Sequence, residues 1–306
     1  MRAEFASAIL DVANKQPETV FMSGDLGYMA LEHVQRHLGK RFINAGVAEQ
    51  NMISMAAGMA AMKLVPWVYS IAPFVTLRPY EQIRNDICMH KFPVKIVGNG
   101  GGYGYGIMGG THHVLQDIGL MRMLPHMQVY VPLFADDVPE AVALMAASPL
   151  PGYLRLNIGV TAIKRTAPFS AWRQLANGNE AVVISTGPVV NSLLQLIPKE
   201  FPGMLDVWSV GIFPFGSMPE ALRQKIVQTR RLIVIEEHTG PGGLGEALAA
   251  ALIGTLPVPI RFKALHADGY SSGRYGSQKW HQEENRLAGL PLVESLRDFI
   301  HEPITH

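Results

Sequence analysis

The stretch Asn44-Ala45-Gly46-Val47-Ala48-Glu49-Gln50-Asn51-Met52 joins a strand-like run at 41–43 to residues 53–62, which are rich in Ala and Met. Residues 53–62 are apolar on nearly every face, which predicts a buried helix. Glu49 then stands at the head of that helix, where a carboxylate is costly unless it is paired or protonated. Two interpretations are open: Glu49 is a functional acid, or it stabilises the helix end three residues after an N-cap at Gly46.

The composition describes a chain with large cores and little surface charge. Of its 306 residues, 48% are hydrophobic and 17% are charged, and the formal net charge is +1. This balance argues against binding to nucleic acid, which needs clustered Lys and Arg. The single cysteine, Cys88, excludes an internal disulfide and a cysteine-built metal site. With no evident signal peptide and no membrane-spanning run, a cytoplasmic protein is expected, part of whose surface another chain covers.

Strand-like and helix-like runs alternate along the chain, which predicts an α/β fold with two doubly wound domains on mostly parallel sheets. The larger domain is expected over residues 1–160, with strands at 19–22, 41–43, 64–70, 94–97, 128–131 and 153–156. Its helices are expected at 2–14, 49–62, 77–90, 117–123 and 136–147. Residues 161–179 lose this periodicity and are interpreted as a linker. The smaller domain, 180–306, is expected to have strands at 181–185, 205–209, 231–236 and 260–264, and helices at 190–197, 217–229 and 243–253.

Glycine is unusually dense in residues 98–110. Such a segment lets the backbone approach a ligand closely or fold tightly. The string Gly104-x-Gly106-x-x-Gly109 matches a dinucleotide-binding pattern, but no helix opens on its last glycine. The Rossmann interpretation therefore lacks its structural context, and an ordered loop with structural glycines is the alternative.

Two histidine pairs are candidates for function. His112 and His113 end the glycine-rich segment at a predicted sheet edge, where a histidine suits proton transfer or hydrogen bonding to a substrate oxygen. Either one can equally be structural. His33 and His37 lie four residues apart on a predicted helix, but no third ligand is near them in sequence, which favours a solvated helix face over a metal pair.

Phe74 and Arg155 also occupy informative positions. Phe74 lies between a predicted strand and the helix expected at 77–90, where an aromatic ring could stack on a planar ligand or belong to the core. Arg155 lies within an apolar strand. It is either paired internally or reaches an anion at the end of that strand.

Taken together and in this order, these segments resemble the pyrimidine-binding half of the thiamine-diphosphate enzymes of the transketolase type. The resemblance covers nearly the whole chain, since the second domain is similar to the C-terminal domain of that family, including its late glycine-rich turn at residues 240–245. The matching segments of the first domain are Ser23-Gly24-Asp25-Leu26, residues 44–51, Phe74 with Arg78-Pro79-Tyr80-Glu81-Gln82, Gly109-Gly110-Thr111-His112-His113 and Tyr153-Leu154-Arg155.

The resemblance implies thiamine diphosphate as the cofactor and assigns roles to single residues. Glu49 would hydrogen-bond N1′ of the aminopyrimidine and drive proton removal from the thiazolium, and Phe74 would stack on that ring. Asp25 and Leu26 would line the cofactor cleft. His112 would face the reacting carbon as a catalytic and substrate-binding residue. The remaining substrate-binding candidates are His113, Arg155 and Arg2.

One family motif is missing from this sequence. The family holds the diphosphate and its divalent metal, Mg²⁺ or Ca²⁺, through Gly-Asp-Gly and a later Asn, and no Gly-Asp-Gly occurs here. The chain also begins where the second domain of a full-length transketolase would begin. It is therefore expected to be the C-terminal subunit of a split enzyme, with no metal ligands of its own. An N-terminal partner subunit would carry the metal in an α2β2 assembly.

The substrate side departs from the pattern of a pentose-phosphate transketolase. Where the family has an Asp four residues before the histidine, this chain has Met108, and Met29 and Gly100 replace two polar residues. We therefore expect ketol or acyl transfer from a sugar-like or 2-oxo donor to an aldehyde-type acceptor, outside housekeeping pentose-phosphate chemistry. The alternatives are the β subunit of a 2-oxo acid dehydrogenase E1, a deoxyxylulose-phosphate-synthase-like enzyme, a non-catalytic subunit and, last, a Rossmann dehydrogenase.

Overall fold

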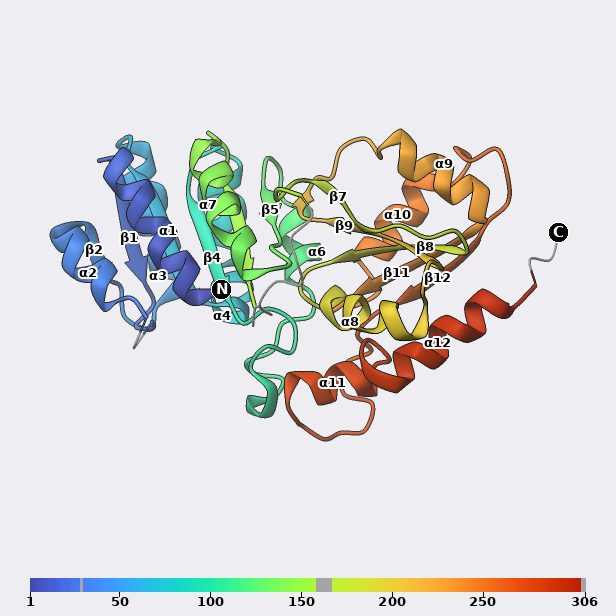
Figure 1. The fold of residues 1–306 in the computed structure, drawn as a ribbon. Helices are drawn as coiled ribbons and strands as arrows, with labels where there is room; N and C mark the ends of the chain where they lie inside the picture. The colour runs from blue at the N-terminus through green and yellow to red at the C-terminus, as the bar shows by residue number, and fades with distance from the viewer. Residues whose placement is uncertain (28–29, 158–166, 304–306) are drawn as a thin grey trace.

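The computed structural model describes residues 1–27, 30–157 and 167–303. They form two open sheets that lie side by side, with helices on both faces of each (Figure 1). The N-terminal unit contains α1 (Arg2–Lys15), β1 (Thr19–Ser23), α2 (Glu32–Leu38), β2 (Phe42–Asn44), α3 (Glu49–Ala61), β3 (Val65–Ile71), α4 (Ala72–Leu77), α5 (Tyr80–Gln82), β4 (Lys95–Asn99), α6 (Asp117–Arg122), β5 (Gln128–Tyr130), α7 (Val138–Ala147) and β6 (Gly152–Leu156). The C-terminal unit contains β7 (Trp172–Ala176), β8 (Ala181–Thr186), α8 (Val190–Glu200), β9 (Leu205–Val210), β10 (Ile212–Phe213), α9 (Glu220–Thr229), β11 (Arg231–Glu236), α10 (Leu244–Leu252), β12 (Arg261–Leu265), α11 (Gln278–Glu284) and α12 (Gly289–His301).

The larger sheet has the strand order β10-β5-β6-β4-β3-β1-β2, and every neighbouring pair except β10 with β5 is parallel. Ser23 at the end of β1 is in register with Asn44 on β2 and Tyr69 on β3, and Ile71 pairs with Asn99 on β4. The carboxyl ends of these strands therefore meet at one edge. In a doubly wound sheet this edge is where ligands bind.

Alternating side chains of the central strands fill two cores, because successive residues of a strand point to opposite faces. Phe21, Trp67 and Tyr69 pack on the face covered by α1, α2 and α7. Met22 and Val68 pack on the other face, with α3, α4 and α6. Each strand is thus apolar on both sides, as a parallel sheet requires.

The smaller sheet has the order β12-β11-β8-β9-β7, in which only β7 is antiparallel to its neighbour. Buried residues of α9 and α10 lie on one face, and those of α8 and α12 lie on the other. One core cluster continues from the larger sheet into the smaller one, and β10 leaves the second unit to pair with β5. The predicted α/β class with two doubly wound units is confirmed. No helix in the described ranges is long and apolar enough to cross a bilayer.

Three details differ from the sequence-based expectations. Residues 172–176 of the predicted linker form β7, because they pair with β9 of the second sheet; residues 161–166 lie outside the described ranges. Phe74 lies inside α4, since the expected helix at 77–90 is replaced by α4, α5 and a π-helical turn at Ile83–Cys88. The sequence analysis also did not anticipate α11 and α12.

The helix after Glu49 is buried on one face only. Its apolar face packs on the sheet, whereas Asn51, Ser54, Met55 and Gly58 are exposed. The expectation of a fully buried helix was therefore wrong: small residues and methionines are compatible with exposure. The N-cap is Ala48, not Gly46, which adopts a φ of +72° two residues earlier.

Candidate active site

Glu49 lies at the carboxyl edge of the larger sheet, where its carboxylate has two side-chain partners. It is only 2% exposed. Its Oε1 accepts a hydrogen bond of 3.0 Å from Ser70 Oγ at the end of β3, and its Oε2 lies 2.8 Å from Arg78 Nη1. The carboxylate is therefore turned into the site and makes no capping hydrogen bond to the backbone of α3. This geometry favours the functional interpretation of Glu49 over the capping one.

The backbone after β1 comes close to this carboxylate. A Cβ atom at Gly24 would lie 3.2 Å from Ser70 Oγ and 3.4 Å from Glu49 Oε1. A side chain there would crowd both groups, so glycine lets the strand end border the acid directly.

An aromatic ring stands next to Glu49, reached through one arginine. The guanidinium carbon of Arg78 lies 3.8 Å from the centre of the Phe74 ring, and Arg78 also forms the ion pair with Glu49. The ring of His112 meets Phe74 edge-on, with centroids 5.3 Å apart. The structure thus brings together Glu49, Phe74 and His112, which are far apart in the sequence.

His112 is half-buried between two rings at the end of the glycine-rich segment. Besides Phe74, it approaches Tyr105, with centroids 5.9 Å apart, and its Nδ1 lies 2.9 Å from Thr111 Oγ1. Burial raises the pKa of Tyr105, while the hydrogen bond from Asn99 and the positive charge of Arg2 lower it. The exposed Arg2 therefore lies near the same group of rings, although it is far from His112 in sequence.

Asp25 and Leu26 border a separate hollow. They line it together with Asn44, whose Nδ2 donates a hydrogen bond of 2.8 Å to Asp25 Oδ1. Asp25 adopts a φ of +58°, and the turn is held by Ser23 Oγ, which accepts from the Leu26 amide. This hollow adjoins the Glu49 group at Gly24 but is not lined by Glu49 or Phe74.

His113 points into the protein, away from its neighbour His112. It is 4% exposed; its Nε2 lies 2.7 Å from the Gly106 carbonyl and its Nδ1 lies 2.9 Å from Tyr270 Oη. The carbonyl can only accept, so Nε2 carries the proton and Nδ1 accepts from the tyrosine. Figure 1 shows the glycine-rich segment beside α11. His113 thus fastens that segment to the C-terminal unit.

Arg155 is paired internally, which decides between the two interpretations of this residue. Its guanidinium is 1% exposed; Nε lies 2.9 Å from Asp117 Oδ2, and Nη2 donates to the carbonyls of Val114 and Glu237. Tyr153 donates a second hydrogen bond to Asp117. In this chain Arg155 holds the two units together, and its guanidinium does not face the surface as a substrate-binding arginine would.

The sequence search overlooked several residues of the site. Ser70, Asn99 and Tyr105 hold or contact its members. Ser70 and Asn99 end or nearly end their strands, a position that could have drawn attention to them. Tyr105 gave no such signal, because its ring is placed by a tertiary fold of the glycine segment. A Cβ at Gly100, whose φ is +76°, would overlap that ring, so the segment needs glycine there.

A model of the transketolase pyrimidine-binding domain matches residues 1–159, just over half of the chain. The chain belongs to the transketolase family. Two relatives support this assignment. One of the two subunits of the apulose-4-phosphate transketolase of Phocaeicola vulgatus is 30% identical, with 85% of each chain covered. The 6-deoxy-6-sulfo-D-fructose transketolase subunit SqwH of a Clostridium species is 31% identical, with 85% of this chain and 83% of that one covered.

A solved structure extends the family assignment to the whole fold. An inactive β4 tetramer of a split-gene transketolase is 25% identical and superimposes with a TM-score of 0.80, over 98% of this chain and 97% of that one. The predicted resemblance to the C-terminal subunit of a split transketolase is confirmed. The family assignment also implies the use of thiamine diphosphate.

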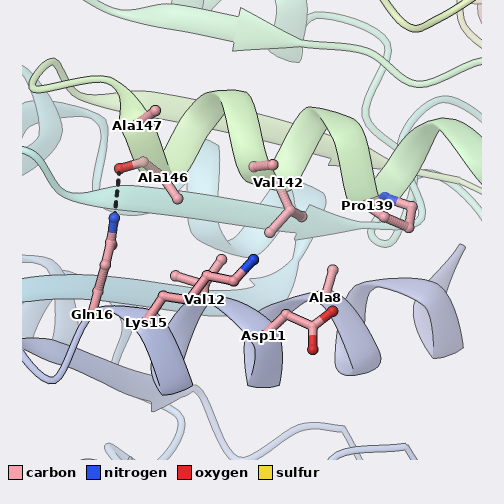
Figure 2. A pocket seen from close by; sticks show the side chains of 10 residues that line it. Ala8, Asp11, Val12, Lys15, Gln16, Pro139, Val142, Ala146 and Ala147 are labelled. Carbon is pink, nitrogen blue, oxygen red and sulfur yellow. Dashed lines mark hydrogen bonds between the residues drawn. The ribbon is translucent and has the colours of Figure 1, made fainter.

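Two further candidate sites hold no such group of residues. The hollow between α1 and α7 in Figure 2 is lined mainly by alanine and valine side chains, and Gln16 closes it with a hydrogen bond to the Ala146 carbonyl. His33 and His37 are both exposed on α2, and His37 bonds to Asn14. Among the described residues no cluster of His, Cys, Asp or Glu could hold a metal ion.

His113 should make the stability of the protein pH-dependent. Burial lowers its pKa from 6.5 to about 4, so between these values the unfolded chain binds the proton and the folded chain does not. Stability contributed by neutral His113 is therefore complete above pH 6.5 and is lost as the pH falls towards 4. We expect His113→Gln, which keeps a donor for Gly106, to lose less stability than the wild type on acidification from neutral pH to about 4.5. Urea unfolding at both pH values measures this, and parallel losses would contradict it.

Proposed function

We propose that Glu49, Phe74 and His112 form this subunit's share of a thiamine-diphosphate site. The observation that carries the proposal is a buried carboxylate with one oxygen directed at a planar cation stacked on an aromatic ring. An aminopyrimidine bound to Glu49 and Phe74 needs the same two contacts. The residues present therefore fit the pyrimidine half of the cofactor, which supplies an electron sink for carbanion chemistry.

Each of the three residues has a role in this proposal. Glu49, held by Ser70, hydrogen-bonds N1′ of the ring and moves a proton there. Phe74 stacks on the ring and fixes its plane. His112 faces the reacting carbon and binds a substrate oxygen, and Arg2 binds substrate near Tyr105. Asp25 and Leu26 line the adjoining part of the cleft. The buried His113 and Arg155 support the glycine segment instead of touching substrate.

We assign the diphosphate and its Mg²⁺ or Ca²⁺ to an N-terminal partner subunit in an α2β2 enzyme. The missing Gly-Asp-Gly motif supports this division. Exposed apolar side chains beside the site support it as well, since such patches mark protein interfaces. They are Val47, Leu77, Ile107 and Met108, with exposures of 71%, 44%, 78% and 52%.

We further propose ketol transfer between a specialised ketose donor and an aldehyde acceptor. The curated relatives are transketolase subunits for apulose 4-phosphate and 6-deoxy-6-sulfo-D-fructose, and Met108 stands where the family has an acid. Xylulose 5-phosphate and ribose 5-phosphate should therefore be poor substrates of the reconstituted pair. A β subunit of a 2-oxo acid dehydrogenase E1 or a deoxyxylulose-phosphate-synthase-like enzyme is the second candidate.

Cofactor binding tests the divided site. Thiamine diphosphate with Mg²⁺ should bind tightly only when this chain is mixed with a partner that contains Gly-Asp-Gly and a downstream Asn. Each chain alone should bind it weakly, because each holds only one end of the molecule. Isothermal titration of the two chains and their mixture measures this. Tight binding by this chain alone would contradict the proposal.

A further inference from the structure

Arg78 occupies the place where the cofactor ring would bind. Its Nη1 lies 2.8 Å from Glu49 Oε2, and its guanidinium carbon lies 3.8 Å above the centre of Phe74. The other carboxylate oxygen, Oε1, is already taken by Ser70. The arginine thus covers both the remaining oxygen of the acid and one face of the aromatic ring.

The guanidinium is a chemical likeness of the group it excludes. It is planar and cationic, and it donates N–H groups in its own plane. A pyrimidine protonated at the nitrogen facing Glu49 has the same three properties. At 3.8 Å the guanidinium is in stacking contact with Phe74, so no second planar group fits between them. The two cannot be bound at the same time.

The position of Arg78 is fixed at its backbone and loose at its side chain. Its carbonyl accepts a hydrogen bond of 3.2 Å from Gln50 Nε2, which ties the end of α4 to the first turn of α3. The side chain itself is 42% exposed, whereas that of Glu49 is 1% exposed. The guanidinium can therefore swing into solvent while Glu49 stays in place.

From these contacts we infer that Arg78 is a positioning residue that substitutes for the aminopyrimidine in the subunit without cofactor and is displaced when the cofactor binds. The inference rests on the proposed function of Glu49 and Phe74. Before the cofactor binds, Arg78 neutralises a buried carboxylate that would otherwise be costly. Because an exposed ion pair and an exposed cation–π contact are both weak, the cofactor can replace them at modest cost.

Substitution of Arg78 in the reconstituted enzyme tests this inference. Arg78→Ala should bind thiamine diphosphate roughly tenfold more tightly than the wild type, since no competing group has to leave. Its association rate should rise too. Arg78→Lys, which can pair with Glu49 but cannot stack as a plane, should fall between the two. Arg84→Ala is the control, because Arg84 is exposed nearby and bonds to its neighbour Asn85.

Equilibrium titration and rapid-mixing measurements of cofactor binding provide the readout. Unchanged or weaker binding by Arg78→Ala, with Arg84→Ala like the wild type, would overturn the inference. If Arg78→Ala does not fold, the comparison of Arg78→Lys with the wild type decides, and equal affinities would overturn it as well. Failure of the wild-type pair to bind thiamine diphosphate would instead refute the proposed function, so the two failures are distinguishable.

Discussion

Replacement of Glu49 by Gln should lower kcat of the reconstituted enzyme by roughly 10²- to 10⁴-fold, the range that a positioned acid–base group contributes. The amide has the shape of the carboxyl group and can still accept from Ser70 Oγ. It cannot hold or release the proton at N1′. Exchange of the cofactor C2 proton with deuterated water, followed by NMR, should therefore stop while the two subunits still assemble.

Two comparisons separate this effect from a general disturbance of the site. Glu81→Gln changes an exposed acid on α5, close to Arg78 in sequence, and should exchange the C2 proton at the wild-type rate. The assembled Glu49→Gln pair should elute at the same size as the wild type in gel filtration. Normal C2 exchange in Glu49→Gln would show that Glu49 is not the proton-relay acid.

Replacement of Arg155 by Met should lower the free energy of unfolding by about 3–5 kcal/mol, because it leaves the carboxylate of Asp117 buried without its cation. Both side chains are almost fully buried, at 1% and 0% exposure. The hydrogen bond from Tyr153 remains but does not neutralise the charge. Urea unfolding of the isolated subunit measures the loss.

A matched set of variants identifies burial as the cause. Lys279→Met breaks the exposed pair with Glu283 and should leave the unfolding midpoint almost unchanged. Adding Asp117→Asn to Arg155→Met should restore part of the lost stability, since the uncompensated charge is removed. Equal effects of Arg155→Met and Lys279→Met would show that the buried pair contributes no more than a surface pair.

Much of the fold was predictable, because it depends on local patterns. The strands at residues 19–22 and 231–236 and the helix at 2–14 were found nearly to the residue from runs of apolar side chains. The strand β7 was missed, because it lies at a sheet edge with a half-exposed, partly polar sequence. The helices α11 and α12 were also overlooked, although α12 has apolar residues at helical spacing.

The site was predictable in its members but not in their contacts. Glu49 was found because an acid between a strand and an apolar helix is unusual, and Phe74 and His112 followed from the resemblance. Nothing local in the sequence indicated that Arg78 would lie between Glu49 and Phe74. That contact depends on how α4 ends relative to α3, which the tertiary packing sets.

By itself the sequence determined the fold class, the family and the acid on which the proposed chemistry depends, since each rests on residues that are close together in the chain or on a recognisable order of motifs. Only the tertiary structure decided which charges are paired. Arg155 meets Asp117 across 38 positions, and His113 meets Tyr270 across 157. Such pairs form because folding places their elements side by side and excludes water, and burial then makes the partner of each polar group obligatory.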